Sequence, residues 1–132
     1  MAAGIYNFTI EQGATFTRTF KYKTSDGTAI PMTGLTPRMQ LREALTSDNF
    51  ILSVNKENGT KSDGSTTSNT VFTLGDGTTD FPTNAFKLTI DADTTASMSF
   101  DTAVYDIEIK TASNVVTRLL QGKIKLSKEV TR

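Results

Sequence analysis

The sequence contains no cysteine, no histidine and no tryptophan. Without cysteine there are no disulfides and no thiolate metal ligands. Without histidine the commonest general base is missing, and so are most zinc-binding constellations. These absences count against an enzyme, and we predict no catalytic, cofactor-binding or metal-binding residues.

An excess of charge of one sign and a long apolar run are also missing. Lysine plus arginine number 14, as do aspartate plus glutamate, so the net charge is zero. A general binder of nucleic acid or of an anionic membrane shows a basic excess. No run approaches the roughly 18 apolar residues of a membrane span, and the first residues lack the features of a signal peptide. We therefore expect one domain over residues 1–132, with no nucleic-acid or membrane partner.

What the sequence does contain is alternation of apolar and polar residues, most clearly in residues 103–132. The inward positions of its two runs are Tyr105, Ile107 and Ile109, then Leu120, Ile124 and Leu126. A short polar break at 111–114 separates the runs. Period-two alternation with such a break predicts an antiparallel hairpin with one buried face.

Further alternating runs lie upstream, at residues 6–10, 16–22, 38–42, 50–54, 71–74 and 86–90. With the turn signals between them they predict an all-β fold, an immunoglobulin-like antiparallel sandwich of about seven to nine short strands. We expect a shared core that contains Phe8, Phe20, Leu88, Tyr105, Ile107 and Ile124. All three tyrosines, which include Tyr6 and Tyr22, fall on inward positions.

Residues 101–107 read Asp-x-Ala-x-Tyr-x-Ile, which looks like the tyrosine corner of immunoglobulin-like sandwiches. The pattern predicts that Tyr105 begins a strand and that its hydroxyl bonds back to the preceding connection.

Several connections carry more specific expectations. One helical turn is expected within 43–48. Another is expected within 91–99, capped by Asp91 or Asp93, with Ala96 and Met98 packed beneath it. The prolines of 30–37 favour an edge or a crossing segment over a central strand. Arg18 interrupts an apolar face and is interpreted as an edge or snorkelling residue, with a buried ion pair as the alternative.

Residues 55–69 contain no apolar side chain, and 75–84 form a second polar stretch anchored by Phe81 and Pro82. A long polar loop cannot be held by burial, so we predict that 55–69 is mobile in the free protein. Either it orders against a neighbouring subunit in an assembly, or it is an insertion that contacts nothing.

The remaining motifs favour structural roles. Gly75-Asp76-Gly77 lacks the third glycine and the helix of a dinucleotide site. Asp76, Asp80, Asp91, Asp93 and Asp101 match no calcium-loop spacing and are interpreted as turn formers and caps. Asp106 and Glu108 are expected to pair across strands with Lys123 and Lys125 rather than to act as an acid–base pair. The glycosylation patterns at Asn7 and Asn58 have no meaning without a secretory signal.

Three segments carry a family resemblance: residues 6–16 (YNFTIEQGATF), 32–40 (MTGLTPRMQ) and 116–132 (VTRLLQGKI through EVTR). The chain resembles small structural proteins of tailed-phage and prophage virions, and its layout is similar to the N-terminal attachment domain of phage baseplate upper proteins. The resemblance covers nearly the whole chain apart from residues 55–84 and includes no catalytic motif. Members often place a glycine just before the strand near Ala103, where this chain has Phe100-Asp101-Thr102.

The resemblance implies a non-enzymatic virion component of the tail, baseplate or fibre attachment, assembled in the bacterial host cytoplasm. Its partners would be other virion proteins, contacted by several copies per particle. One alternative is a capsid decoration or neck protein with the same fold. Another is a module that binds host glycans, although such sites usually expose Tyr or Trp.

Overall fold

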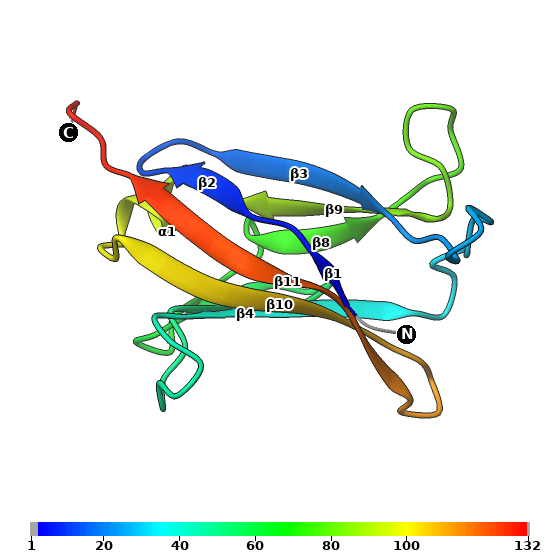
Figure 1. The fold of residues 1–132 in the computed structure, drawn as a ribbon. Helices are drawn as coiled ribbons and strands as arrows, with labels where there is room; N and C mark the ends of the chain where they lie inside the picture. Colours follow the sequence, from blue (N-terminus) through cyan, green and yellow to red (C-terminus); the bar gives the residue numbers. More distant parts are fainter. Residues whose placement is uncertain (1–2, 132) are drawn as a thin grey trace.

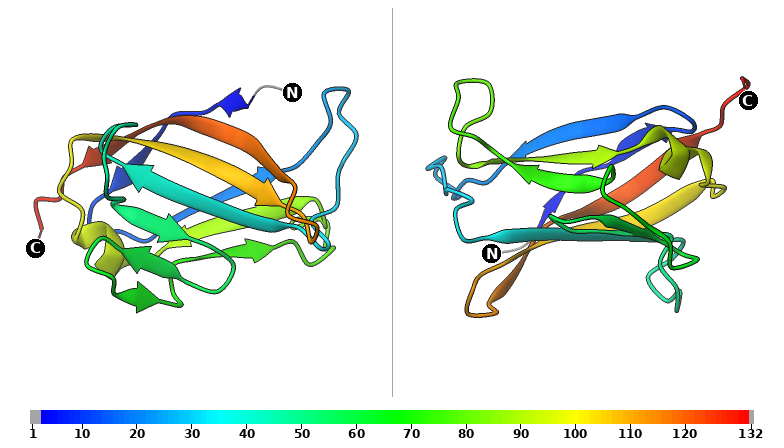
Figure 2. Two further views of the ribbon diagram at one scale, coloured as in Figure 1. Left: turned by 90° about the horizontal axis from the view of Figure 1, so that it is seen from below. Right: turned by 180° about the vertical axis from the view of Figure 1, so that it is seen from behind.

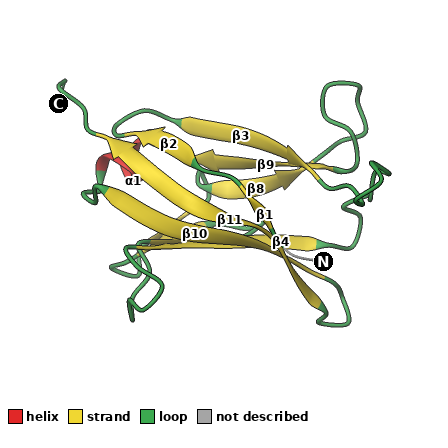
Figure 3. Cartoon of the chain, viewed as in Figure 1, coloured by secondary structure: helices red, strands yellow, loops and turns green. Residues whose placement is uncertain are grey.

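Two β-sheets pack face to face in the computed structural model, which describes residues 3–131 (Figures 1 and 3). The elements found in this range are β1 (Gly4–Ile5), β2 (Phe8–Glu11), β3 (Phe16–Lys21), β4 (Thr36–Arg42), β5 (Leu52–Val54), β6 (Gly59–Lys61), β7 (Thr66–Thr67), β8 (Val71–Leu74), β9 (Ala85–Ile90), α1 (Ala92–Ala96), β10 (Thr102–Lys110) and β11 (Val116–Ser127). The prediction of an all-β sandwich is confirmed. The immunoglobulin-like topology stays a prediction.

The larger sheet is built around the predicted C-terminal hairpin. Its strand order is β1-β11-β10-β4-β5-β6-β7, and β2 also pairs with β11. β10 pairs antiparallel with both β11 and β4, as expected, whereas β1 and β2 run parallel to β11. The sheet is therefore mixed at its N-terminal edge, which the expectation of a purely antiparallel sandwich had missed. The turn of the β10–β11 hairpin extends away from the sandwich body (Figures 1 and 2).

The smaller sheet has the order β3-β9-β8 and covers the inner face of the larger one. Alternate residues of both sheets meet in one core, in which Phe8 stacks on Phe16 and Phe20 stacks on Phe86, with ring centroids 5.1 and 5.4 Å apart. All six predicted core residues are buried. The period-two pattern thus identified the buried face correctly in the strands that carry these residues.

The prediction that residues 55–69 form a loop without strands is wrong, whereas their mobility in the free protein stays a prediction. Its residues form β6 and β7, an antiparallel pair that extends the larger sheet beyond β5. The turn between them closes at Gly64, whose φ is +87° and whose N–H donates to the carbonyl of Lys61. Backbone pairing along the edge of β5 takes the place of side-chain burial. These two strands and the short β1 explain why the described residues contain eleven strands rather than about seven to nine.

Two other connections differ from expectation. Residues 43–48 contain turns and bends but no helix. Pro37 lies inside β4, which is a central strand. It is tolerated there because β5 pairs only with residues 39–41 of β4, so β4 has a neighbour on one side alone at Pro37. The polar stretch at 75–84 has no strand or helix, and its anchor Phe81 is half-buried, as predicted.

The short helix α1 begins as predicted, with Asp91 at the N-cap position. The Asp91 carboxylate accepts hydrogen bonds from the hydroxyls of Thr70 (2.6 Å) and Thr94 (2.5 Å) and makes no capping bond to the backbone. The residues of α1 that are buried are Thr94 and Thr95, whereas Ala96 is exposed. The prediction for Ala96 was wrong, and that for Met98 was right.

Candidate interaction face

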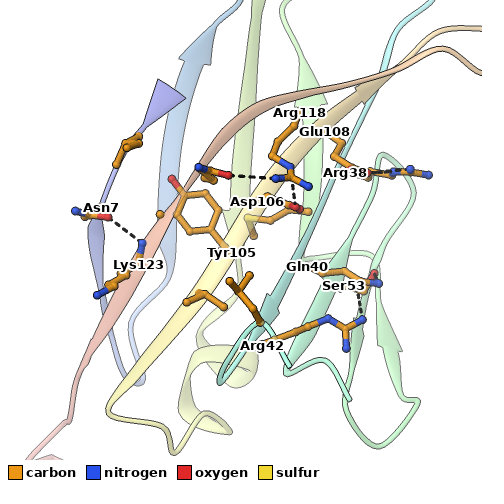
Figure 4. A pocket seen from close by; sticks show the side chains of 16 residues that line it. Asn7, Arg38, Gln40, Arg42, Ser53, Tyr105, Asp106, Glu108, Arg118 and Lys123 are labelled. Atoms are coloured by element: carbon orange, nitrogen blue, oxygen red, sulfur yellow. Dashed lines mark hydrogen bonds and ion pairs between the residues drawn. The ribbon is translucent and has the colours of Figure 1, made fainter. Parts of the chain in front are cut away.

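The outer face of the larger sheet, turned away from the smaller sheet, carries a groove (Figure 4). Side chains of β4, β5, β10 and β11 line it, together with Ile5, Asn7 and Leu45 from outside the central strands. Because β4 buries Met39 and Leu41, its alternate residues Arg38, Gln40 and Arg42 face the groove.

Ion pairs cross this face between neighbouring strands. The Arg38 Nη2 lies 2.9 Å from Glu108 Oε1, and the Arg38 Nε–H donates to the same oxygen at 2.9 Å. Arg118 Nε lies 3.4 Å from an Asp106 carboxylate oxygen. Register explains the first pair, because Glu108 stands opposite Arg38 on β4. Arg118 stands opposite Glu108 on β11 and reaches Asp106 diagonally. The two carboxylates are thus neutralised by arginines on both flanking strands.

The predicted partners of these carboxylates were wrong. Lys123 stands opposite Val104, and Lys125 stands opposite Thr102. A register irregularity between Ile107 and Glu108 shifts the second half of the hairpin, so Arg118 comes into range instead. The prediction that the pair has a structural, charge-matching role nevertheless agrees with the ion pairs observed.

Asp106 lies in the least favourable electrostatic environment on this face. Partial burial raises the pKa of its carboxyl above the ordinary value, and repulsion from Glu108 adds to the rise. The nearby guanidinium groups of Arg118, Arg38 and Arg42 offset only part of this effect. A further positive charge brought to the groove by a partner would therefore favour the ionised form of Asp106.

Polar side chains continue along the face beside the ion pairs. Arg42 donates to the backbone carbonyl of Ser47 and to the side-chain oxygen of Gln40, each at 2.9 Å. Gln40 in turn donates to the Ser53 hydroxyl at 3.3 Å. This network spans β4 and β5 and fixes the positions of the Gln40 and Arg42 side chains. The face is therefore ordered before any partner arrives, which reduces the entropy lost on binding.

Exposed apolar side chains lie at the margins of the groove. Ile5 on β1 is 77% exposed, and Leu45 in the β4–β5 connection is 89% exposed. The alternation pattern gave no signal for either residue, because neither belongs to a long strand. Apolar groups beside ordered charges are typical of protein-binding surfaces, where burial of the apolar atoms adds affinity and the charges set orientation.

The N-terminal segment is fastened across one side of the groove. Tyr6 N–H donates to the Gln121 carbonyl at 3.0 Å, and Lys123 N–H donates to Asn7 Oδ1 at 2.8 Å. The Tyr105 hydroxyl donates to the Tyr6 backbone carbonyl. Burial raises the pKa of Tyr105, so the hydroxyl keeps the proton that it donates to a higher pH than an exposed tyrosine would.

These contacts correct the tyrosine-corner prediction in part. The hydroxyl of Tyr105 does bond to a backbone carbonyl, but the carbonyl belongs to the N-terminal segment and not to the preceding connection. Tyr105 is also the fourth residue of β10 rather than its first. The bond therefore joins β10 to the N-terminal segment.

The predicted edge role of Arg18 is confirmed, because β3 is at the edge of the smaller sheet. Its guanidinium lies over the rings of Phe16 and Tyr6, 5.5 and 5.8 Å from their centroids, and donates to the Tyr6 hydroxyl. The alternative of a buried ion pair is wrong, since no carboxylate in the described range is bonded to Arg18.

The other aspartates considered as ligands lie apart. Asp76 accepts bonds from Thr78 in a local turn, and Asp101 forms an ion pair with Lys128 at 3.0 Å. Within residues 3–131 no group of three acidic, histidine or cysteine side chains could hold a metal ion. The same range contains no helix with the length and apolarity to cross a membrane.

Comparison with known proteins adds no family to this description. The chain matches no protein-family model, and no curated protein shows significant sequence similarity to it. The resemblance to virion proteins therefore stays a prediction. The groove offers ordered charges, hydrogen-bonding groups and apolar margins, which are the means of binding another surface.

Proposed function

We propose that this protein is a non-enzymatic structural component of a tailed-phage particle, where it connects neighbouring subunits of the tail, baseplate or fibre attachment. The observation that carries the proposal is the outer face of the larger sheet, where exposed Ile5 and Leu45 flank an ordered set of arginine–carboxylate pairs. Such a face suits a protein partner better than a small substrate, because it extends over four strands and both of its carboxylates are already paired with arginines.

The segments that resemble virion proteins also support the proposal by their location. Residues 36–40 and 116–124 contribute β4 and β11, which frame the groove, and the segment from 6 to 8 crosses its margin. Residues 55–84, which the resemblance omits, form β6, β7, β8 and a loop. The segments quoted for the resemblance therefore include two of the strands that present the outer face.

The glycan-binding alternative has no comparable support. Of the three tyrosines, all of which lie in the described range, Tyr105 is buried and both Tyr6 and Tyr22 are half-buried against the core. A sugar platform needs an exposed aromatic ring. A capsid decoration or neck protein would use the same fold and the same kind of face, so location in the particle distinguishes it from the leading proposal.

The test is incorporation into particles made in cells that express tagged variants. Leu45→Glu places a charge at the margin of the face and should reduce the copies per particle by about tenfold, as expected for the loss of one apolar anchor at an interface. Val130→Glu is the matched control, because Val130 is 93% exposed and does not line the groove. Equal incorporation of both variants and of the wild type would overturn the role of this face.

A further inference from the structure

β3 leaves a row of backbone groups open on one edge of the smaller sheet. Within the described residues β3 pairs with β9 alone (Figure 1). Tyr22 N–H donates to the Asn84 carbonyl at 2.8 Å, which fixes the alternation of the ladder. The N–H and C=O groups of Phe16, Arg18 and Phe20 therefore point toward β9, and those of Thr17, Thr19 and Lys21 point away from it.

The outward-directed residues are accessible. Thr17, Thr19 and Lys21 are all exposed, and none of them takes part in a side-chain hydrogen bond or ion pair recorded for residues 3–131. Three consecutive open positions at a spacing of two residues are what an added β-strand requires, because its main chain bonds to every second residue of the edge. The outer edge of β3 thus has the backbone geometry that an added strand needs, and no strand pairs with it in the described residues.

An aromatic cluster lies directly beneath this edge. Phe8, Phe16 and Phe20 keep 8–9% of their surface exposed, more than the rest of the buried core. Tyr6 packs on Phe8 and on Phe20, with ring centroids 5.7 and 6.1 Å apart. Apolar side chains of an added strand would cover these rings, so strand addition would bury apolar surface as well as pair the backbone.

The edge is also positively charged. Residues 15–23 contain Arg18, Lys21 and Lys23 and no acidic residue. None of the three is in an ion pair within the described part of the chain. Lysines and an inward-pointing charge are the means by which edge strands resist indiscriminate pairing. An apolar strand would bury the Arg18 guanidinium without a counter-charge, whereas a strand with a carboxylate at that position would satisfy it.

We propose that the free edge of β3 is a strand-addition site for an extended segment of a neighbouring protein. In that segment apolar and polar residues alternate, and one inward-facing carboxylate meets Arg18. The proposed connecting function is used only to say where the partner comes from, namely a neighbouring protein of the particle. The sequence pattern expected of the partner is inferred from the chemistry of the edge alone. Arg18 selects the partner, because strands without an acidic residue leave its charge unpaired.

The binding test uses a short synthetic peptide in which valine and one central glutamate alternate with threonine. NMR titration of the isotope-labelled protein should shift the amide signals of Thr17, Thr19 and Lys21 first. A peptide with lysine in place of glutamate should bind about tenfold more weakly, the loss expected for one charge-assisted hydrogen bond. A peptide with proline in place of a threonine next to the glutamate should also bind more weakly to the edge in an antiparallel arrangement, because the residue opposite Thr17 or Thr19 then lacks a pairing N–H.

Two protein variants locate the site. Thr19→Pro removes one outward N–H and breaks no ladder bond, so the variant should fold and lose about tenfold in affinity. Thr19→Val keeps the N–H and is the matched control. Arg18→Gln should abolish the preference for the glutamate peptide over the lysine peptide. If a variant fails to fold, the lysine and proline peptides with the wild-type protein still test the need for the carboxylate and for backbone pairing.

Several results would overturn the site. They are absence of binding at millimolar peptide, shifts confined to β8 or to the outer face, and shifts at β3 that appear with protein concentration alone. The last result would make a second copy the occupant.

Hydrogen exchange separates this proposal from the proposed function: the amides of Thr17 and Thr19 should be protected in particles and unprotected in free protein. Peptide binding by a protein that is absent from particles would refute the function and keep the site.

Discussion

Gly122 is the position at which a single methyl group should displace a whole segment. A Cβ at this residue would lie 2.8 Å from Asn7 Oδ1 and 2.9 Å from the Tyr6 carbonyl carbon, and closer still to the Tyr6 carbonyl oxygen. Two of these three atoms belong to the backbone, so a change of rotamer cannot relieve the contact. Gly122→Ala must therefore move the segment that joins β1 to β2 off β11.

The magnitude follows from the bonds that this movement breaks. They are the N–H of Tyr6 to the Gln121 carbonyl, the N–H of Lys123 to Asn7 Oδ1, and the Tyr105 hydroxyl to the Tyr6 carbonyl. At about 1 kcal/mol each, their loss should destabilise the protein by about 2–4 kcal/mol. Phe8 and Ile10 of β2 remain anchored in the core, which limits the loss to this segment.

Denaturant melts of Gly122→Ala measure this cost, and hydrogen exchange of Tyr6 and Lys123 locates it. Gly4→Ala is the matched control, because the nearest atom to its Cβ would be the flexible Leu120 Cδ2 at 3.1 Å. That variant should change the free energy of unfolding by no more than about 0.5 kcal/mol. A loss below about 0.5 kcal/mol for Gly122→Ala, with unchanged exchange, would refute the close approach.

Three further predictions concern buried or charged polar groups. Tyr105→Phe should cost about 0.5–1.5 kcal/mol in denaturant melts, because the Tyr6 carbonyl loses its hydroxyl donor, and an unchanged midpoint would contradict this. Burial acts to raise the pKa of Asp91, but hydrogen bonds, first from Thr70, outweigh burial and lower the pKa. The ionised Asp91 carboxylate should therefore stabilise the fold fully above the pKa of Asp91 in the unfolded chain. This stabilisation should be lost as the pH falls through the pKa of Asp91 in the folded protein. Thr70→Val should flatten that acid-side decline, and parallel curves would count against the assignment. Because burial raises the pKa of Asp106, its ionised form destabilises the fold, so Asp106→Asn should stabilise the protein at neutral pH and lose that gain in acid.

The strands with a buried face could be read from the sequence, because alternation directly reports which side chains point inward. Ile107 and Ile124, for example, are buried as predicted. β6 and β7 could not be found in this way. They bury almost no side chains, and their stability comes from backbone pairing with β5 that leaves no hydrophobic pattern in the sequence.

The candidate face was only partly predictable. The charged positions of β4 and β10 follow from alternation, but their partners depend on a register shift between Ile107 and Glu108 that no local signal marks. The exposed Leu45 lies in an irregular connection, and the parallel docking of β1 on β11 depends on Gly122, whose role appears only when the distant Tyr6 is placed beside it. Long-range contacts of this kind are not encoded in the periodicity of either segment.

The most direct test of the proposed function is a quantitative mass-spectrometric inventory of purified phage particles from cells that produce this protein. The proposal predicts that the chain is present in every preparation, at a fixed number of copies relative to a tail or baseplate protein, and that it remains after a high-salt wash. Absence from intact particles, or a trace amount that varies between preparations and washes away, would contradict a structural role in the virion.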